Sequence, residues 1–213
     1  MMEIKSFVFN PFYENTYLLW DETKEAIIID PGCYEKYEQE ELKSFISQQG
    51  LNIKLIVNTH CHIDHVLGSY DMKEAYHCPL WIPEGELEVL RSVVAYAPQW
   101  GISQYTEAEA DRLLKESDVI NFGNTTLTSL LVPGHSPGHL MFLHHESKRM
   151  IGGDVLFKGS IGRTDLPGGD HQQLLERIKT KVYSLDEDIE IFPGHGPTTT
   201  IGEEKRTNPF VKG

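Results

Sequence analysis

The segment "NTHCHIDH", residues 58–65, places three histidines and an aspartate within its last six positions. It directly follows the apolar run "IKLIV", which is typical of a buried strand. Imidazole nitrogens and carboxylate oxygens are good ligands for Zn²⁺, Mn²⁺ and iron. Because solvated histidines have no need of this density, we interpret the cluster as a metal site at the end of a strand.

The spacing within this segment divides its side chains between two directions. His60 and His62 are two residues apart, so in an extended backbone they face the same side, and Cys61 faces the other. Asp64 and His65 continue into a turn or helix start and point elsewhere. One stretch can therefore serve two neighbouring metal ions, which together can activate a hydroxide and polarise a carbonyl. We expect Cys61 to pack against the fold and not to bind metal.

Three further strand ends carry residues that could join such a site: His135 in "PGHSPGH", Asp154 in "GGD" and His195 in "PGHG". Alone, each has a structural alternative, as a hydrogen-bonded loop histidine or a turn residue. In α/β folds, however, ligand-binding residues collect at strand ends. The shared position therefore favours one assembled site, in which the two carboxylate oxygens of Asp154 can bridge two ions.

Apolar patterning predicts the elements that position these residues. Strands are expected at 6–9, 16–20, 26–30, 53–57, 79–82, 118–123, 125–134, 139–145, 148–154 and 188–193, and helices at 35–49, 65–77, 84–97, 106–117 and 170–185. We interpret residues 83–117 as a helical lid or insert within a single domain, residues 1–213. Aromatic residues in and beside this stretch either wall a substrate pocket or close the core: Trp81, Tyr96, Trp100 and Tyr105.

Length and composition narrow the class of protein. The 213 residues suffice for one α/β domain, and a net charge of −13 argues against nucleic acid and anionic membranes as partners. Three cysteines without CxxC spacing, no signal-peptide pattern and no apolar run of about 18 residues predict a cytoplasmic protein. The expected partner is a small-molecule substrate, and nothing in the sequence indicates the oligomeric state.

The motifs resemble those of a known family. "THCHIDH" matches the T-H-x-H-x-D-H signature of the metallo-β-lactamase superfamily, and "VPGHSPGH", "IGGD" and "FPGHG" supply its remaining ligand positions. The resemblance covers almost the whole chain, including the opening "NTYLLWDETKEAIIIDPG". It implies an α/β fold, the αββα metallo-β-lactamase sandwich, with two mixed sheets covered by helices and the metals at one edge.

The resemblance also implies a role for each ligand position. The first metal is held by His60, His62 and His135, the second by Asp64, His65 and His195, and Asp154 bridges them. Asp64 also orients the nucleophile, so Asp64 and Asp154 are the expected catalytic carboxylates. The expected cofactor is a pair of divalent metal ions, with Zn²⁺ preferred and Fe or Mn as alternatives. His62 argues against flavodiiron proteins, which carry Glu at this position.

Within the superfamily, the likeness is strongest to the glyoxalase II group, the hydroxyacylglutathione hydrolases. "LFKGSIGRTDLPGGD" resembles the short bacterial form, which lacks the helical C-terminal domain that supplies much of the glutathione site. This implies a binuclear metallohydrolase that uses a bridging hydroxide to hydrolyse a thioester such as S-lactoylglutathione. Arg163 either binds a substrate carboxylate or pairs with Asp165. His139 either hydrogen-bonds near the site or packs in its loop, and we favour packing.

Two other functions remain as alternatives. A persulfide dioxygenase of the same fold also carries "GRTD", but there a single iron is held by fewer of the ligands. The complete set of second-metal ligands favours hydrolysis. A non-catalytic binding protein is the other alternative, and the retention of every ligand position argues against it.

Overall fold

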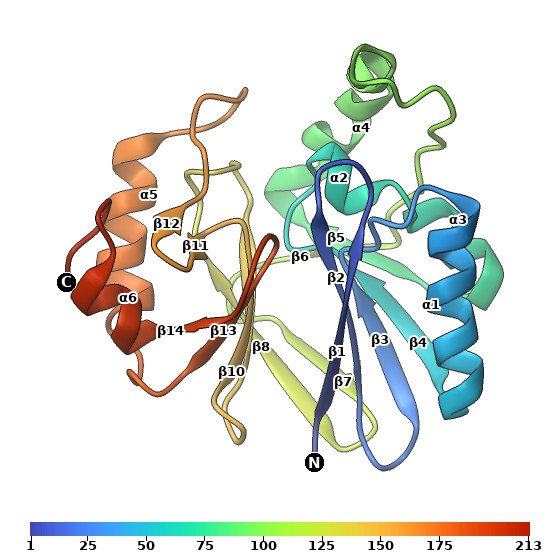
Figure 1. Ribbon diagram of the computed structural model, residues 1–213, viewed down its shortest axis with the longest axis horizontal. Coiled ribbons are helices and arrows are strands. Elements are labelled where there is room, and N and C mark those ends of the chain that lie inside the picture. Colours follow the sequence, from blue (N-terminus) through green and yellow to red (C-terminus); the bar gives the residue numbers. More distant parts are fainter. The chain divides into compact units, whose positions relative to one another are not determined.

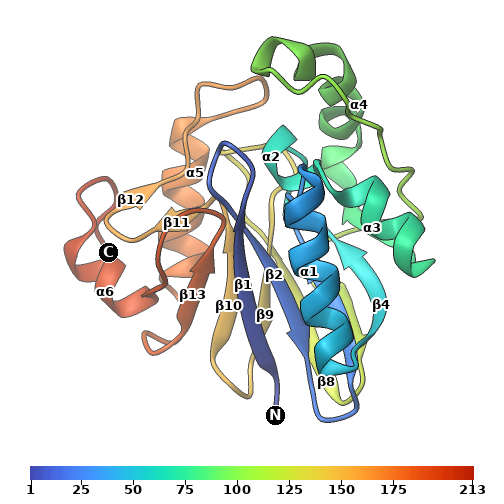
Figure 2. The same ribbon diagram turned by 45° about the vertical axis from the view of Figure 1, so that its right-hand side comes forward.

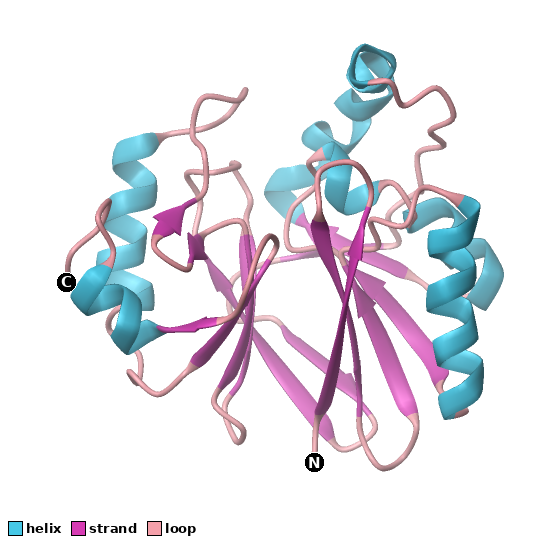
Figure 3. Cartoon of the chain, in the orientation of Figure 1, coloured by secondary structure: helices cyan, strands magenta, loops and turns pink.

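The computed structural model describes residues 1–213 and divides into two compact units. Unit one comprises residues 1–114 and 121–125, and unit two comprises residues 115–120 and 126–213. Each of the two six-stranded sheets is accompanied by helices (Figures 1 and 3). None of the helices has both the length and the apolar character that crossing a membrane requires.

The sheet of unit one positions the histidine-rich segment. Its strands follow chain order: β1 (Glu3–Phe9), β2 (Glu14–Trp20), β3 (Glu25–Ile29), β4 (Asn52–Val57), β5 (Leu80–Pro83) and β6 (Arg112–Leu114). β1 to β3 are antiparallel, whereas β3 to β6 are parallel. Ile29 pairs with Val57, so β3 and β4 end side by side, and the residues that follow them meet at one edge of the sheet.

The helices of unit one bury apolar faces against this sheet. They are α1 (Lys36–Gln49), α2 (Ile63–Val66), α3 (Ser69–Tyr76) and α4 (Leu87–Tyr96), with 3₁₀ turns η1 (Glu84–Glu86) and η2 (Ala97–Trp100). α1, which runs along the sheet in Figure 2, packs Leu42 and Ile46 into the same core as Ile28 and Ile56. Gly50 ends α1 in the left-handed conformation, which costs glycine little.

The sheet of unit two carries the remaining candidate ligands. Its strand order is β14-β13-β10-β9-β8-β7, with β7 (Val119–Phe122), β8 (Thr125–Leu131), β9 (Leu140–His144), β10 (Arg149–Gly153), β13 (Glu190–Pro193) and β14 (Thr199–Thr200). Residues 121–122 of β7 and Thr125 of β8 are counted with unit one. A two-stranded sheet joins β11 (Leu156–Phe157) to β12 (Ser160–Ile161). The helical segments are α5 (His171–Arg177), the π-helical η3 (Ile178–Val182) and α6 (Ile201–Thr207). Leu174, Ile178 and Val182 pack into a core that includes Met141 and Ile191.

Several predicted elements differ from the structure. The helix expected at 106–117 is wrong: these residues form a loop and then β6, which pairs with β5. The helix expected at 65–77 is divided at Gly68 into α2 and α3. Of the two helices expected in the 83–117 insert, only α4 forms. That residues 83–117 act as a lid within a single domain, residues 1–213, stays a prediction.

Candidate metal centre

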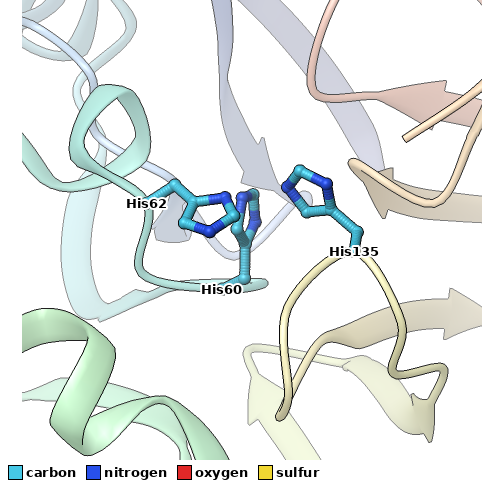
Figure 4. A group of neighbouring side chains, drawn as sticks. All are labelled: His60, His62 and His135. Carbon is cyan, nitrogen blue, oxygen red and sulfur yellow. The ribbon is translucent and has the colours of Figure 1, made fainter. Parts of the chain in front are cut away.

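The candidate ligand histidines of unit one lie on the loop after β4 and in the first turn of α2. His60 is fully buried, and His62 precedes α2 as its N-cap residue (Figure 4). The ring centroid of His60 lies 4.8 Å from that of His62 and 4.1 Å from that of His65. These three imidazoles therefore lie close together.

Asp30, at the end of β3, organises this loop. Its Oδ1 accepts hydrogen bonds from the backbone N–H of Thr59 at 2.7 Å and from the side chain of Asn58 at 3.2 Å. Its Oδ2 accepts from the Thr59 hydroxyl at 2.7 Å and faces His65 Nδ1 at 3.1 Å. One buried carboxylate thus fixes the residues on either side of His60, because buried polar groups retain their hydrogen bonds.

These contacts also determine which nitrogen of each histidine can bind a metal. The hydroxyl hydrogen of Thr59 goes to Asp30, so its oxygen accepts from His60 Nδ1, 3.1 Å away. His65 Nδ1 donates to Asp30 in the same way. Both rings therefore carry their metal-binding lone pair on Nε2, the arrangement that orients metal-ligating histidines. Asp30 therefore accepts directly from the His65 ring and orients the His60 ring through the Thr59 hydroxyl.

Asp64, in the first turn of α2, is held by the β1–β2 turn. Asn10 donates from its side-chain amide to the backbone carbonyl of Asp64 at 2.9 Å and to that of Gly32 at 3.0 Å. The Asp64 carboxylate lies 3.6 Å from His65 Nε2. Burial, together with the negative charge of Asp64, raises the pKa of Tyr96 to about 12, so this tyrosine stays protonated.

In unit two, Asp154 lies between two histidines. His135 is on the loop between β8 and β9 (Figure 4), and Asp154 and His195 follow the parallel strands β10 and β13. Asp154 Oδ2 is 3.6 Å from His135 Nε2 and 3.5 Å from His195 Nε2. His135 Nδ1 donates to the backbone carbonyl of Arg163 at 2.7 Å, which leaves the lone pair on Nε2.

The backbone of Asp154 is fixed by His139 and by a close approach of Gly162. His139 is fully buried, and its Nε2 accepts a hydrogen bond from the Asp154 N–H at 2.9 Å. The prediction that His139 simply packs in its loop is therefore wrong. Its ring hydrogen-bonds to the backbone of Asp154, a candidate ligand. A Cβ atom at Gly162 would collide with the Asp154 carbonyl and crowd His135 Nδ1. Only glycine allows this approach.

Arg163 forms the structural pair that was one of its two expected roles. Its Nε and a terminal nitrogen donate to both carboxylate oxygens of Asp165, at 2.7 and 2.8 Å. This hydrogen bonding lowers the pKa of Asp165 to about 2. Both side chains are largely exposed, so the pair is open to exchange with a substrate carboxylate, and that role of Arg163 stays a prediction.

Cys61 packs as expected. Its side chain is fully buried in the core of unit one, and burial raises the pKa of its thiol well above the ordinary value. The backbone N–H of Cys61 donates to Glu86 Oε2 at 3.0 Å. Neither Asp30 nor Glu86 was expected near the site. Asp30 could have been found by the same strand-end rule as the ligands, since it follows "AIII". No local pattern marks Glu86.

The donor set fits a metal that prefers nitrogen and oxygen. Unit one supplies the Nε2 atoms of His60 and His65, and unit two supplies that of His135; in each ring the other nitrogen is hydrogen-bonded to an oxygen. A carboxylate lies within 3.6 Å of His65 Nε2, and another lies within 3.6 Å of His135 Nε2. This chemistry suits Zn²⁺, Mn²⁺ or iron.

Comparison with known proteins identifies relatives of the whole chain. The family model described as the metallo-β-lactamase superfamily matches residues 9–195. The hydroxyacylglutathione hydrolase GloC of Haemophilus influenzae is 39% identical over 99% of this chain and 98% of its own length.

Solved structures agree with the expected fold class. A structure described as BLEG-1 B3 metallo-β-lactamase is 34% identical, with a TM-score of 0.90 over 99% of this chain and 100% of that one. TTHA1623, solved in a di-iron-bound form, is 35% identical, with a TM-score of 0.86 over 97% and 100%. These likenesses confirm the metallo-β-lactamase fold, with its two mixed sheets flanked by helices.

Proposed function

The chain belongs to the metallo-β-lactamase superfamily of metal-dependent hydrolases, and from that membership we propose that it hydrolyses a thioester of the hydroxyacylglutathione type. Its Haemophilus relative, a hydroxyacylglutathione hydrolase, supports this substrate class. S-Lactoylglutathione is the substrate we would test first.

We assign two ions to the seven ligand positions. His60, His62 and His135 would hold one ion, Asp64, His65 and His195 would hold the other, and Asp154 would be a ligand that both ions share. The observation that best supports this assignment is the position of Asp154 Oδ2, within 3.6 Å of His135 Nε2 and 3.5 Å of His195 Nε2. A carboxylate placed between imidazoles that belong to different ions is suited to bridging them.

When bound, the ions would supply a hydroxide nucleophile near neutral pH and polarise the thioester carbonyl. The chain's own residues orient the ligands: the Arg163 carbonyl fixes the tautomer of His135, and the His139 ring holds the backbone of Asp154. Cys61 is not a competing nucleophile, because burial keeps its thiol protonated. The leaving group is a thiolate, which needs no strong acid.

Zinc is the metal we propose, with iron and manganese as alternatives, since a relative holds two irons. We propose a cytoplasmic location and a small-molecule thioester as the partner. The formal net charge of −13 argues against nucleic acid and anionic membranes as partners.

The test is a panel of thioesters, lactones and β-lactams incubated with metal-loaded protein. We expect turnover of S-lactoylglutathione and its loss in His60→Ala. Hydrolysis of β-lactams alone, or no hydrolysis at all, would contradict the proposal. Oxygen uptake with a persulfide by a chain that holds a single iron would instead establish the dioxygenase alternative.

A further inference from the structure

Glu86 is a buried carboxylate outside the seven ligand positions. It is the last residue of η1, immediately before α4, and its side chain is fully buried. Its Oε2 accepts the backbone N–H of Cys61 at 3.0 Å, across 25 residues of sequence. Burying a carboxylate is costly unless strong hydrogen bonds compensate. Its location therefore needs a reason beyond filling space.

The peptide that Glu86 holds lies between two candidate ligands. Cys61 separates His60 from His62, so fixing its N–H fixes the backbone from which both imidazoles project. Residues 58–62 belong to neither a helix nor a strand, and their backbone is anchored at the two ends, where the Asn58 N–H donates to the Trp81 carbonyl and the His62 carbonyl accepts from the His65 N–H. Glu86 thus supplies rigidity that the loop itself does not have.

The other contacts of the loop secure different atoms. Asp30 holds the N–H and hydroxyl of Thr59, and the Thr59 oxygen orients the His60 ring. On the other side, the His62 carbonyl accepts the N–H of His65 at 3.0 Å. Between these anchors, the Glu86 contact fixes the Cys61 peptide.

We propose that Glu86 is a positioning residue for the ion bound by His60 and His62, acting through the Cys61 peptide. This inference rests on the ligand assignment of the proposed function. It goes further, because it gives α4 and η1 a part in metal affinity although they contribute no ligand.

The test compares metal affinities of wild type, Glu86→Ala and Glu86→Gln, with Glu88→Ala as the matched control from the same segment. Glu88 is 81% exposed and pairs only with the surface residue Arg91. Affinities for Zn²⁺ are measured against a chelator, Co²⁺ absorption reports the ligand geometry, and thermal unfolding of the metal-free chains reports the fold.

We expect Glu86→Ala to bind one of its two ions about 10- to 100-fold more weakly and to change its Co²⁺ spectrum. Glu86→Gln keeps an acceptor oxygen for the Cys61 N–H, so it should recover most of that affinity. Glu88→Ala should match wild type. If Glu86→Ala does not fold, Glu86→Asp replaces it, because its shorter reach breaks the same contact and should weaken the same ion.

A variant that unfolds more easily without metal yet binds both ions like wild type would overturn the inference, since Glu86 would then be purely structural. A Glu86→Gln variant as weak as Glu86→Ala would also overturn it, because the hydrogen bond would not be the cause. Wild type that binds two ions but hydrolyses no thioester would overturn the proposed substrate class and leave this inference standing.

Discussion

Each candidate ligand histidine of unit one with a defined tautomer depends on a neighbouring oxygen. Asp30 accepts from His65 directly and sets the direction of the Thr59 hydroxyl, which in turn orients His60. The sequence indicated the candidate histidines but not this carboxylate as their partner, because "DPG" by itself indicates only the end of a strand. The pairing of β3 with β4, which brings Asp30 beside the loop, is a long-range contact without a local sequence signal.

Replacing Asp30 with Asn tests this organisation. The NH₂ group of the new amide would face at least one of the N–H and O–H groups that now donate a hydrogen bond to Asp30. A buried donor would then be left without an acceptor. We expect the free energy of unfolding of the metal-free chain to fall by about 2–4 kcal/mol in urea denaturation. Asp188→Asn, at an 81% exposed position, is the control. A loss at Asp30 no larger than in this control would show that the hydrogen bonds contribute little.

Cys61→Ala tests whether the cysteine between the histidines is a ligand. The thiol is buried in the core, and burial raises its pKa, so we expect both ions to bind as in wild type. The free energy of unfolding should fall by about 1 kcal/mol, because the lost sulfur leaves a small cavity. The metal content of Cys61→Ala is measured by elemental analysis. Loss of an ion in this variant would show that Cys61 is a ligand.

At the scale of the element, strong patterns predicted the structure well. The helix expected at 35–49 is present as α1 with its glycine end, and Asp170 caps α5 by accepting the N–H of Gln173. The helix expected at 106–117 does not form. Its alanines and acids favour a helix locally, but pairing with β5 stabilises a strand at Arg112–Leu114. α6 was missed although Thr200, three residues before Glu203, is a recognisable capping pattern.

The β9–β10 hairpin gives a prediction for pH. Burial lowers the pKa of His144 below its ordinary 6.5, and its Nδ1 accepts hydrogen bonds from Ser147. His144 therefore binds a proton more readily in the unfolded chain than in the folded one. The stability contributed by the neutral His144 ring is present above pH 6.5 and is lost as the pH falls through the lowered pKa of the folded chain. His144→Asn keeps an acceptor but cannot titrate.

We expect the free energy of unfolding of wild type to fall relative to that of His144→Asn as the pH decreases from about 7 to 5. Urea denaturation at a series of pH values measures the difference. A difference that stays constant across this range, or one that changes in the opposite direction, would contradict the assignment of a neutral buried His144.

At the scale of the molecule, the proposed assignment takes its ligands from loops far apart in the sequence, so metal binding should favour the folded chain over the unfolded one. Removing the ions with a chelator should therefore lower the unfolding temperature. At a free-ion concentration about 1000 times the dissociation constant, one site contributes about 4 kcal/mol. Calorimetry of loaded and chelated protein measures this. Equal unfolding temperatures would mean that the ligand positions do not form a site.

The proposed function is thioester hydrolysis by the chain with two bound metal ions. It is tested most directly by titrating metal into the chelated protein while following S-lactoylglutathione hydrolysis. We predict that turnover rises with loading, reaches its maximum at two ions per chain and is abolished in Asp154→Ala. A wild-type chain that takes up two ions and leaves every thioester intact would contradict the claim.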